Sequence, residues 1–262
     1  MLSLCTLFSG SSGNCVFISD GRTNLLVDCG VSGKRITAAL EQLGVDPCSL
    51  DAVLVTHEHS DHTHSVGIMH RRFGIDIYAN ELTWRAVEPT AGRYDGRSLH
   101  LFTGRFCIGD IEVQPFAIPH DAAQPVGYSF YAENKKITIA TDIGHVSEEL
   151  YSQIAGSDVA LIEANHDVEM LKMGPYPYPL KRRILSDRGH LSNESAGELC
   201  ARLAKGGTRK LLLGHLSQQN NLPEIAYQTV RNHLEQARAE LGGDVSLEVA
   251  PRYTSSALCV AG

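Results

Sequence analysis

The stretch that decides the fold runs from an apolar segment into a cluster of histidines and reads Ala52-Val53-Leu54-Val55-Thr56-His57-Glu58-His59-Ser60-Asp61-His62. Its four apolar residues predict a buried β-strand that ends where the polar residues begin. Imidazoles mixed with a carboxylate are the usual ligands of zinc, manganese or iron. His57 and His59 alternate while Asp61 and His62 point elsewhere, so the spacing suits two adjacent ions better than one. The alternative is a solvated, histidine-rich turn after a strand.

The composition is that of an ordinary globular protein. The 262 residues are 43% hydrophobic and 20% charged, which argues against disorder and membrane residence. The length permits one large domain or two small ones, and no low-complexity linker or repeat divides the chain, so we expect a single domain over residues 1–262. The formal net charge of -7 does not exclude a nucleic-acid substrate, because bound divalent cations would offset negative charge in the cleft.

The cysteines and the first residues bear on where the protein works. Seven widely spaced cysteines contain no Cys-x-x-Cys pair, which predicts reduced, buried thiols in a cytoplasmic protein. The first 19 residues carry no charged side chain, but the run Ser9-Gly10-Ser11-Ser12-Gly13-Asn14 interrupts them and no basic residue precedes it. We therefore expect two strands joined by a tight loop here, and neither a signal peptide nor a membrane anchor.

Hydrophobic periodicity and capping residues predict strands alternating with helices along the chain. The expected strands are 2–8, 16–19, 24–27, 52–55, 75–78, 111–118, 136–140, 159–164, 210–213 and 247–250. The expected helices are 33–43, 65–73, 81–87, 148–155, 193–204 and 222–241, with Ser32, Ser147, Ser192 and Asn221 as N-caps and Pro89 halting the third. Residues 91–103 are expected to be irregular. Residues 174–189 contain three prolines and are expected to form a loop or lid.

Five candidate ligands each stand just beyond the carboxyl end of a different predicted strand, and five strands would not share this feature by chance. They are Asp28, His57, His120, Asp142 and His215. Strand ends gathered along one edge of a sheet assembly place their loop side chains around a common crevice. The sequence therefore predicts a metal-binding crevice at that edge.

The motif HEHSDH at residues 57–62 resembles the HxHxDH signature of the metallo-β-lactamase fold superfamily, and the resemblance covers nearly the whole chain in the right order. It implies an α/β (α+β) protein, a four-layer αββα sandwich, with two divalent metal ions per chain, zinc or manganese, with iron as a further candidate. By this resemblance His57, His59 and His120 would hold one ion, Asp61, His62 and His215 the other, and Asp142 would bridge them, with Asp28 orienting a ligating imidazole.

The resemblance also implies the chemistry. Two bridged ions would lie about 3.5 to 4 Å apart and share a hydroxide, which is the expected nucleophile. His190 precedes a predicted helix and is not needed by either ion, so it could orient a phosphate or protonate a leaving alkoxide. An extra histidine at this point resembles the phosphodiesterase and nuclease branch, including tRNase Z-like enzymes. Asp61 and His190 are therefore the predicted catalytic residues. The alternative for His190 is a helix-start histidine satisfied by local backbone.

Three further segments look like the YycJ/WalJ group, which is associated with 5′→3′ DNA exonuclease activity in bacteria. They are residues 9–14, residues 162–167, which read IEANHD, and residues 180–184, which read LKRRI and lead to His190. The resemblance implies a DNA substrate. Small or basic residues in these segments could contact its phosphates, and the candidates are Ser11, Asn14, His166, Lys181, Arg182 and Arg183. A plain hairpin loop and a solvated helix face are the alternatives.

Two other functions stay open at this point. The first is a hydrolase of the same fold that acts on a small cyclic phosphodiester, a lactone or a thioester, because a fold alone does not fix the substrate. The second is a non-catalytic, metal-bearing DNA-binding module, which the full set of candidate ligands disfavours.

Overall fold

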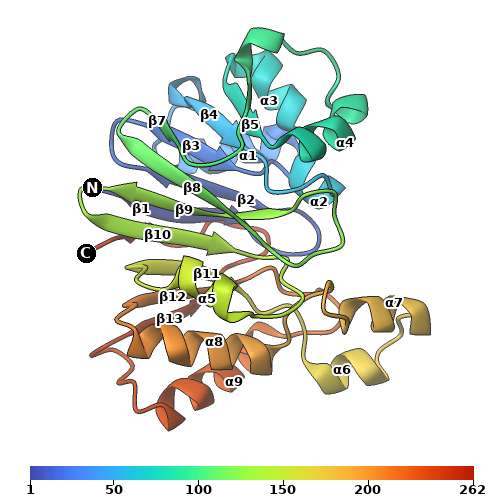
Figure 1. Ribbon diagram of the computed structural model, residues 1–262, viewed down its shortest axis with the longest axis vertical. Coiled ribbons are helices and arrows are strands. Elements are labelled where there is room, and N and C mark those ends of the chain that lie inside the picture. The colour runs from blue at the N-terminus through green and yellow to red at the C-terminus, as the bar shows by residue number, and fades with distance from the viewer.

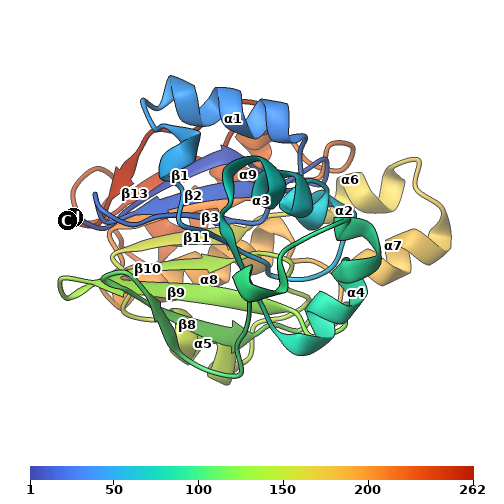
Figure 2. The same ribbon diagram turned by 90° about the horizontal axis from the view of Figure 1, so that it is seen from above.

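Two seven-stranded sheets packed face to face form the centre of the protein (Figure 1). The structure, a computed structural model, describes all 262 residues. Helices cover the outer face of each sheet, so the order of layers is helix, sheet, sheet, helix (Figures 1 and 2). The predicted αββα sandwich is therefore confirmed.

The first sheet has the strand order β14-β1-β2-β3-β4-β5-β6, and strands β3 to β6 run parallel. Its strands are β1 (Ser3–Phe8), β2 (Cys15–Ser19), β3 (Asn24–Val27), β4 (Ala52–Leu54), β5 (Asp76–Ala79), β6 (Leu99–Leu101) and β14 (Cys259–Val260). The helices between them are α1 (Gly33–Gln42), α2 (Ser60–Thr63), α3 (Val66–Phe73) and α4 (Glu81–Ala91). Ile36 and Leu40 of α1 lie four residues apart and are fully buried, as expected for an amphipathic helix packed on a sheet.

The second sheet has the strand order β13-β12-β11-β10-β9-β8-β7, and strands β10 to β13 run parallel. Its strands are β7 (Phe106–Ile108), β8 (Ile111–Ala117), β9 (Val126–Ala132), β10 (Lys135–Ala140), β11 (Val159–Glu163), β12 (Lys210–Gly214) and β13 (Ser246–Val249). Helices α5 (Glu148–Ile154), α8 (Asn193–Lys205) and α9 (Pro223–Gln236) cover it, whereas α6 (Val168–Met173) and α7 (Tyr178–Ile184) project from the sandwich (Figure 1). Because β8 and β10 are both antiparallel to β9, the carboxyl ends of β8, β10, β11 and β12 meet at one edge.

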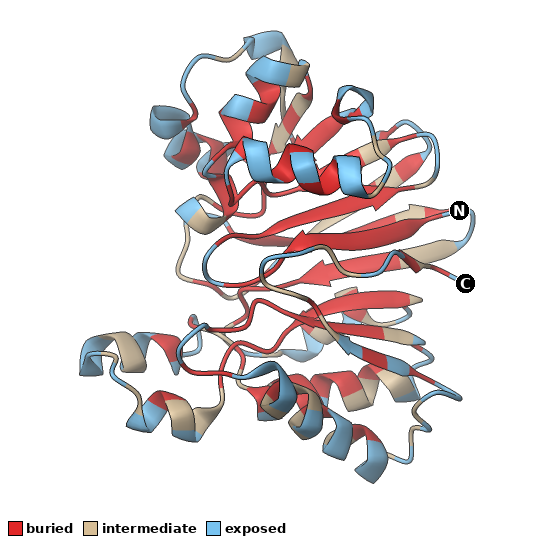
Figure 3. Cartoon of the chain, turned by 180° about the vertical axis from the view of Figure 1, so that it is seen from behind, coloured by how far each residue is buried: buried red, intermediate tan, exposed pale blue.

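Three apolar layers hold the sandwich together, one between the sheets and one under each helical layer. The central strands are buried almost throughout, the edge strands β6, β7 and β13 are partly exposed, and the helices expose their outer faces (Figure 3). Tyr128 of β9 is fully buried between the sheets, and its hydroxyl donates a 2.6 Å hydrogen bond to the carbonyl of Val55. This bond ties the second sheet to the residue that follows β4, two positions before the histidine motif.

Two predicted boundaries around Pro89 are wrong. Helix α4 continues through Pro89 to Ala91, and the segment expected to be irregular contains strand β6. Pro89 removes one helical hydrogen bond, but the buried side chains of Trp84 and Val87 keep the helix on the sheet. Arg71 donates to the carbonyl of Ala91 at 2.7 Å and so satisfies the end of the helix.

Other predictions also need correction. Part of the expected loop at 174–189 is helix α7, and α9 begins at Pro223 and ends at Gln236, with Leu222 at the N-cap position. Asn221 does not cap this helix. Its amide donates instead to the carbonyl of Ala164 at 2.9 Å and to Asn193 at 2.8 Å, which joins the start of α8 to the exit of β11. The strands β7, β9 and β14 and the helices α2 and α6 were not predicted.

Candidate metal centre

The backbone turns sharply where three candidate ligands or supports leave their strands. Asp28, Asp142 and His215 follow β3, β10 and β12 with φ values of 62°, 61° and 55°. Non-glycine residues rarely adopt this left-handed conformation, and such strained residues cluster at functional sites. Gly30 allows a further close approach, because a Cβ atom there would lie 1.7 Å from the carbonyl oxygen of Asp61. The geometry at this edge is therefore specified by the backbone as well as by the side chains.

A first group of three histidines comes together from two parts of the chain. His57 and His59 lie in the loop after β4, and His120 lies in the loop after β8. The Nδ1 atom of His59 lies 3.1 Å from Nε2 of His57 and 3.4 Å from Nε2 of His120. Two nitrogens that bind one zinc ion tetrahedrally at about 2.0 to 2.1 Å are separated by about 3.4 Å. The three nitrogens could therefore hold one ion.

A second group lies beside the first. The Oδ2 atom of Asp61 is 3.7 Å from Nε2 of His62 and 3.6 Å from Nε2 of His215. The carboxylate of Asp142 lies between the groups, with Oδ2 3.4 Å from Nε2 of His62 and Oδ1 3.8 Å from Nε2 of His120. The structure thus brings together all seven residues that the sequence singles out as ligands.

Two buried polar atoms without hydrogen-bond partners indicate whether the seven candidate ligands suit a metal ion. Asp142 Oδ2 and His215 Nε2 are buried and have no hydrogen-bond partner in the protein. A buried carboxylate oxygen and a buried imidazole nitrogen without partners are costly unless they coordinate an ion. A donor set of neutral nitrogens and carboxylate oxygens suits a divalent cation. The residues present therefore fit divalent metal.

The pKa values of His57 and His120 in the first group and of His62 in the second move in opposite directions. Burial lowers the pKa of His57 and of His120, which keeps both rings in the neutral state that a metal requires. Burial would also lower the pKa of His62, but three nearby carboxylates, Asp142 foremost, outweigh it and raise the pKa to about 9. The carboxylates around His62 therefore favour a positive charge at this place in the cluster.

Asp28 supports the cluster from behind. Its Oδ2 accepts a hydrogen bond from Nδ1 of His62 at 2.7 Å, which leaves Nε2 of that ring facing the crevice. Thr56 holds the same carboxylate in place, since its backbone N–H and its hydroxyl donate to Asp28 at 2.9 and 2.8 Å. This is the arrangement that the sequence analysis expects of Asp28, and Thr56 is an addition to it.

Glu163, the last residue of β11, is a site residue that the sequence analysis missed. Its side chain is fully buried, and Oε1 accepts from Nδ1 of His190 and Nδ1 of His215, both at 2.8 Å. Its Oε2 accepts from the backbone N–H groups of Ile143 and Leu191 at 2.8 and 3.0 Å. Burial would raise the pKa of Glu163, but the charges and hydrogen bonds of both histidines hold it below its usual range. A buried acid at a strand end beside the other ligands was the available signal.

His190 lies at the edge of the cluster with its side chain 19% exposed. The bond from its Nδ1 to Glu163 fixes the tautomer, so Nε2 is the nitrogen left for a substrate. The alternative of a histidine satisfied by local backbone is not what the structure shows, because its partner is a carboxylate 27 residues away. The geometry thus permits proton transfer at Nε2.

The residues predicted to contact the substrate differ in how far they are exposed. Asn14 is buried, and its side chain accepts from the N–H of Gly10 at 2.9 Å and lies 3.1 Å from Nε2 of His62, so it supports the cluster from within the protein. His166 is only 1% exposed, which leaves its ring little surface to offer a substrate. Ser11 is exposed and lines a hollow of about 380 Å³ beside Asp61. His64, next to the motif, lines the same hollow and is not among the clustered ligands.

The basic candidates lie on α7. The Nζ atom of Lys181 donates to the carbonyl of Lys172 at 2.6 Å and so ties α7 to α6. Arg183 pairs with Asp121, whose Oδ1 has no hydrogen-bond partner and lies 3.4 Å from Nε2 of His120. Arg182 makes no ion pair and is exposed. Arg183 therefore reaches the cluster, whereas Arg182 faces solvent.

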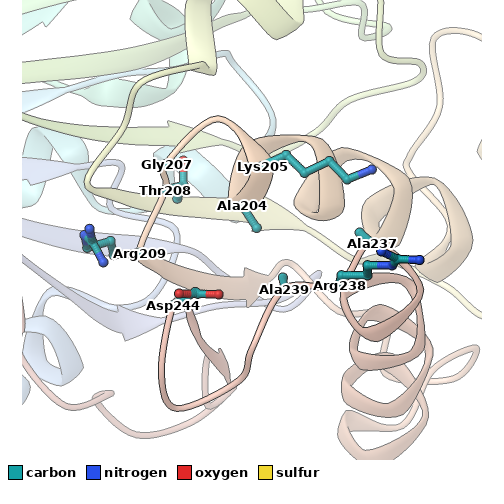
Figure 4. Close-up of a pocket in the computed structure, with 9 residues that line it drawn as sticks. All are labelled: Ala204, Lys205, Gly207, Thr208, Arg209, Ala237, Arg238, Ala239 and Asp244. Atoms are coloured by element: carbon teal, nitrogen blue, oxygen red, sulfur yellow. The ribbon is translucent and has the colours of Figure 1, made fainter.

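A second pocket lies away from this centre. It holds about 230 Å³ between the ends of α8 and α9, where Lys205, Arg209 and Asp244 line it (Figure 4). Arg209 directly precedes β12, so this pocket lies at the amino-terminal edge of the second sheet, opposite the strand ends that carry the candidate ligands. It takes no part in the metal centre.

No helix in the structure has both the length and the apolar character needed to cross a bilayer.

Residues 23–216 match the family described as "Beta-lactamase superfamily domain". The chain is 46% identical to the exodeoxyribonuclease WalJ of Streptococcus pneumoniae over 247 residues, which cover 93% of this chain and 91% of that protein. It is 41% identical to the exodeoxyribonuclease YycJ of Bacillus anthracis over 237 residues, 90% of each chain.

Solved structures agree on the fold. The metallo-β-lactamase fold protein YhfI from Bacillus subtilis matches with a TM-score of 0.71 at 14% sequence identity, over 98% of this chain and 99% of that one. The predicted resemblance is thus confirmed at the level of sequence and of architecture. The chain belongs to the β-lactamase superfamily and, within it, to the family of the exodeoxyribonucleases WalJ and YycJ.

Proposed function

We propose that this protein is a metal-dependent phosphodiesterase that removes nucleotides from DNA ends in the 5′→3′ direction. The observation that carries the proposal is similarity over 90% or more of the chain to two proteins named exodeoxyribonucleases. The converging histidines and carboxylates support it, because phosphodiester cleavage by metal-dependent enzymes uses such a site. Residues 1–262 would act as one hydrolase domain. The seven cysteines are all unpaired, which supports work in the reducing cytoplasm.

Two divalent ions, zinc or manganese with iron as a further candidate, are proposed for the two groups. His57, His59 and His120 would hold one, Asp61, His62 and His215 the other, and Asp142 would contact both. When bound, such a pair lowers the pKa of a water ligand and neutralises charge on the phosphoryl oxygens. Asp61 suits a ligand role because the charges of His62 and His215 outweigh its burial and hold its pKa well below the usual range.

The remaining steps belong to side chains of this chain. His190, held through Nδ1 by Glu163, would carry a proton on Nε2 and pass it to the oxygen that leaves phosphorus. Asp28 keeps Nε2 of His62 turned into the crevice. Arg183, paired with Asp121, places a cation at the rim where a neighbouring phosphate would lie. Ser11 lines the same hollow as Asp61 and would contact the same DNA strand.

The test is digestion of duplex DNA labelled separately at its 5′ and 3′ ends, with manganese or zinc added, followed as a time course. We expect the 5′ label to leave first as a mononucleotide while the 3′-labelled strand shortens gradually. The control is Asp61→Ala, which should release no label with either metal.

Two results would contradict the proposal. Turnover of bis(p-nitrophenyl) phosphate without release of either DNA label would indicate a hydrolase of small phosphodiesters. Salt-dependent binding of DNA without cleavage under any divalent metal would indicate a binding module.

A further inference from the structure

Helices α6 and α7, residues 168–184, form an arm that stands out from the sandwich (Figures 1 and 3). Unlike α5, α8 and α9, the arm covers no sheet (Figure 1). Large apolar side chains are exposed at its tip, with Met173 85% exposed at the end of α6 and Tyr178 72% exposed at the start of α7. Such side chains beyond the sandwich are available to a partner.

The other end of the arm is fastened to the candidate metal centre. Arg183 pairs with Asp121, and Arg188 donates through Nη2 to the carbonyl of His120 at 2.9 Å. The backbone N–H of His190 donates to the carbonyl of Ile184 at 3.0 Å, which fixes the end of α7 to the loop that carries His190. A nucleic-acid strand bound along α7 would therefore lead directly into the crevice that the candidate metal ligands line.

The arm differs from the rest of the protein in charge. Residues 168–184 contain four lysines and arginines against one acidic residue, a net charge of +3, within a chain of net charge -7. The remaining residues thus carry -10. A polyanion that approaches this protein meets repulsion on most of the surface and attraction at the arm.

One face of α7 combines an aromatic ring with a cation. Tyr178 and Arg182 are four residues apart, so they lie on the same face, and the Arg182 guanidinium is 6.0 Å from the centre of the Tyr178 ring. Arg182 has no acidic partner, and Tyr178 makes no hydrogen bond through its hydroxyl. Tyr178 and Arg183 are five residues apart, which is about 7.5 Å along the helix, or roughly two stacked nucleotides.

We infer that the arm binds unpaired nucleotides next to the scissile bond, with a base stacked on Tyr178 and backbone phosphates at Arg182 and Arg183. This inference rests on the proposed action on DNA. Aromatic side chains bind single strands by stacking on the face of a base, and within an intact duplex those faces are covered by neighbouring base pairs. The arm therefore favours the frayed end of a strand over paired DNA.

The first experiment compares Tyr178→Ala with Tyr178→Phe on a labelled single-stranded oligonucleotide and on bis(p-nitrophenyl) phosphate. Tyr178→Ala should raise the KM for the oligonucleotide about tenfold, whereas Tyr178→Phe, which keeps the ring, should stay near wild type. Neither change should alter turnover of the small substrate. Leu258→Ala is the matched control, because Leu258 is 52% exposed beside β14, away from the arm.

The second experiment uses fluorescence. The chain has one tryptophan, Trp84, which is buried, so Tyr178→Trp adds an exposed reporter. In an Asp61→Ala background, a single-stranded oligonucleotide should quench this emission, and a duplex closed by a hairpin at both ends should not.

Several results would overturn the inference while leaving the proposed function standing. They are DNA cleavage with an unchanged KM in Tyr178→Ala, equal loss on both substrates, or equal quenching by the closed duplex. If Tyr178→Ala instead changes the molar mass measured by light scattering and leaves the KM unchanged, the arm joins two copies of this chain and the inference is wrong. Absence of any cleavage of DNA by the wild type would refute the proposed function itself.

Discussion

The two ends of the second sheet both carry charged residues, but they use them differently. At the amino-terminal end, Lys136 donates through Nζ to the carbonyls of Gln153 and Ala155 at 2.6 and 2.7 Å. Asp158 accepts from the N–H of Lys136 at 2.9 Å and pairs with Lys135 at 3.2 Å. At the carboxyl end, Asp142 Oδ2 and His215 Nε2 have no partner.

The presence or absence of hydrogen-bond partners distinguishes the amino-terminal edge from the carboxyl edge, where the candidate metal centre lies. Lys135, Lys136 and Asp158 at the first edge are satisfied within the protein, so they hold the ends of strands in place. Charges at the second edge point into a shared crevice and stay incomplete without a ligand. Clusters of charged residues are common in proteins, whereas several buried polar atoms that converge without hydrogen-bond partners indicate a binding site.

The largest expected effect tests this contrast with one substitution at each edge. Asp142→Asn keeps the size of the side chain but removes the charge between the two groups, and we expect turnover to fall at least about 10³-fold, as loss of several kcal/mol of charge stabilisation implies. Asp158→Asn should leave turnover near wild type and lower the free energy of unfolding by about 1 to 2 kcal/mol. The measurements are steady-state cleavage, metal content and urea unfolding.

The contrast fails if the two variants behave alike. Wild-type turnover in Asp142→Asn with both metals retained would mean that the carboxylate is structural. Loss of turnover in a folded Asp158→Asn would mean that the opposite edge takes part in the reaction.

A smaller effect is expected at Glu163. Glu163→Gln preserves the shape of the side chain but can place an amide N–H₂ against histidine N–H groups. Turnover of bis(p-nitrophenyl) phosphate should fall about 10- to 100-fold, as for loss of other groups that orient a ligand or an acid. His190→Ala provides the reference, with an expected loss of about 10² to 10⁴ and normal metal content.

The pH profile distinguishes positioning from a merely structural role. If Glu163 acts through His190, the basic limb of the profile should shift in Glu163→Gln and be absent in His190→Ala. Glu163→Gln that loses activity equally at every pH, or only because it is less folded, would contradict the positioning role.

The sequence predicted that the candidate ligands lie close together, because the features that place them are local. The motif at 57–62 follows an apolar run, and Asp28, Asp142 and His215 each follow a run of the same kind, so strand ends alone predicted that they meet. The parallel arrangement of β3 with β4 and of β10 to β12 then brings these ends to one edge.

The parts that the sequence did not predict depend on distant contacts. Glu163 acquires its role from His190 and His215, which are 27 and 52 residues away. Asn14 looked like a loop residue open to a phosphate, but its contact with His62 spans 48 residues and turns it inward. Helix α7 was not predicted because three prolines lie in and before it. It forms nonetheless, since Pro179 occupies the first turn, where a missing N–H costs nothing.

The smallest expected effect concerns Lys136 at the amino-terminal edge. Burial lowers the pKa of Lys136 to about 8, below the value of about 10.4 for an unfolded chain. Between these pH values the unfolded state holds a proton that the folded state has released, so this residue makes stability rise with pH across that window. Below pH 8 both states are protonated, and the contribution is constant. Lys136→Met removes the titration but retains an apolar stem, so the difference in unfolding free energy, wild type minus variant, should grow between pH 8 and 10. Urea unfolding at several pH values measures it, with turnover as the second readout. A difference that does not vary with pH would show that burial does not perturb this lysine, and a loss of turnover would show that the two edges are coupled after all.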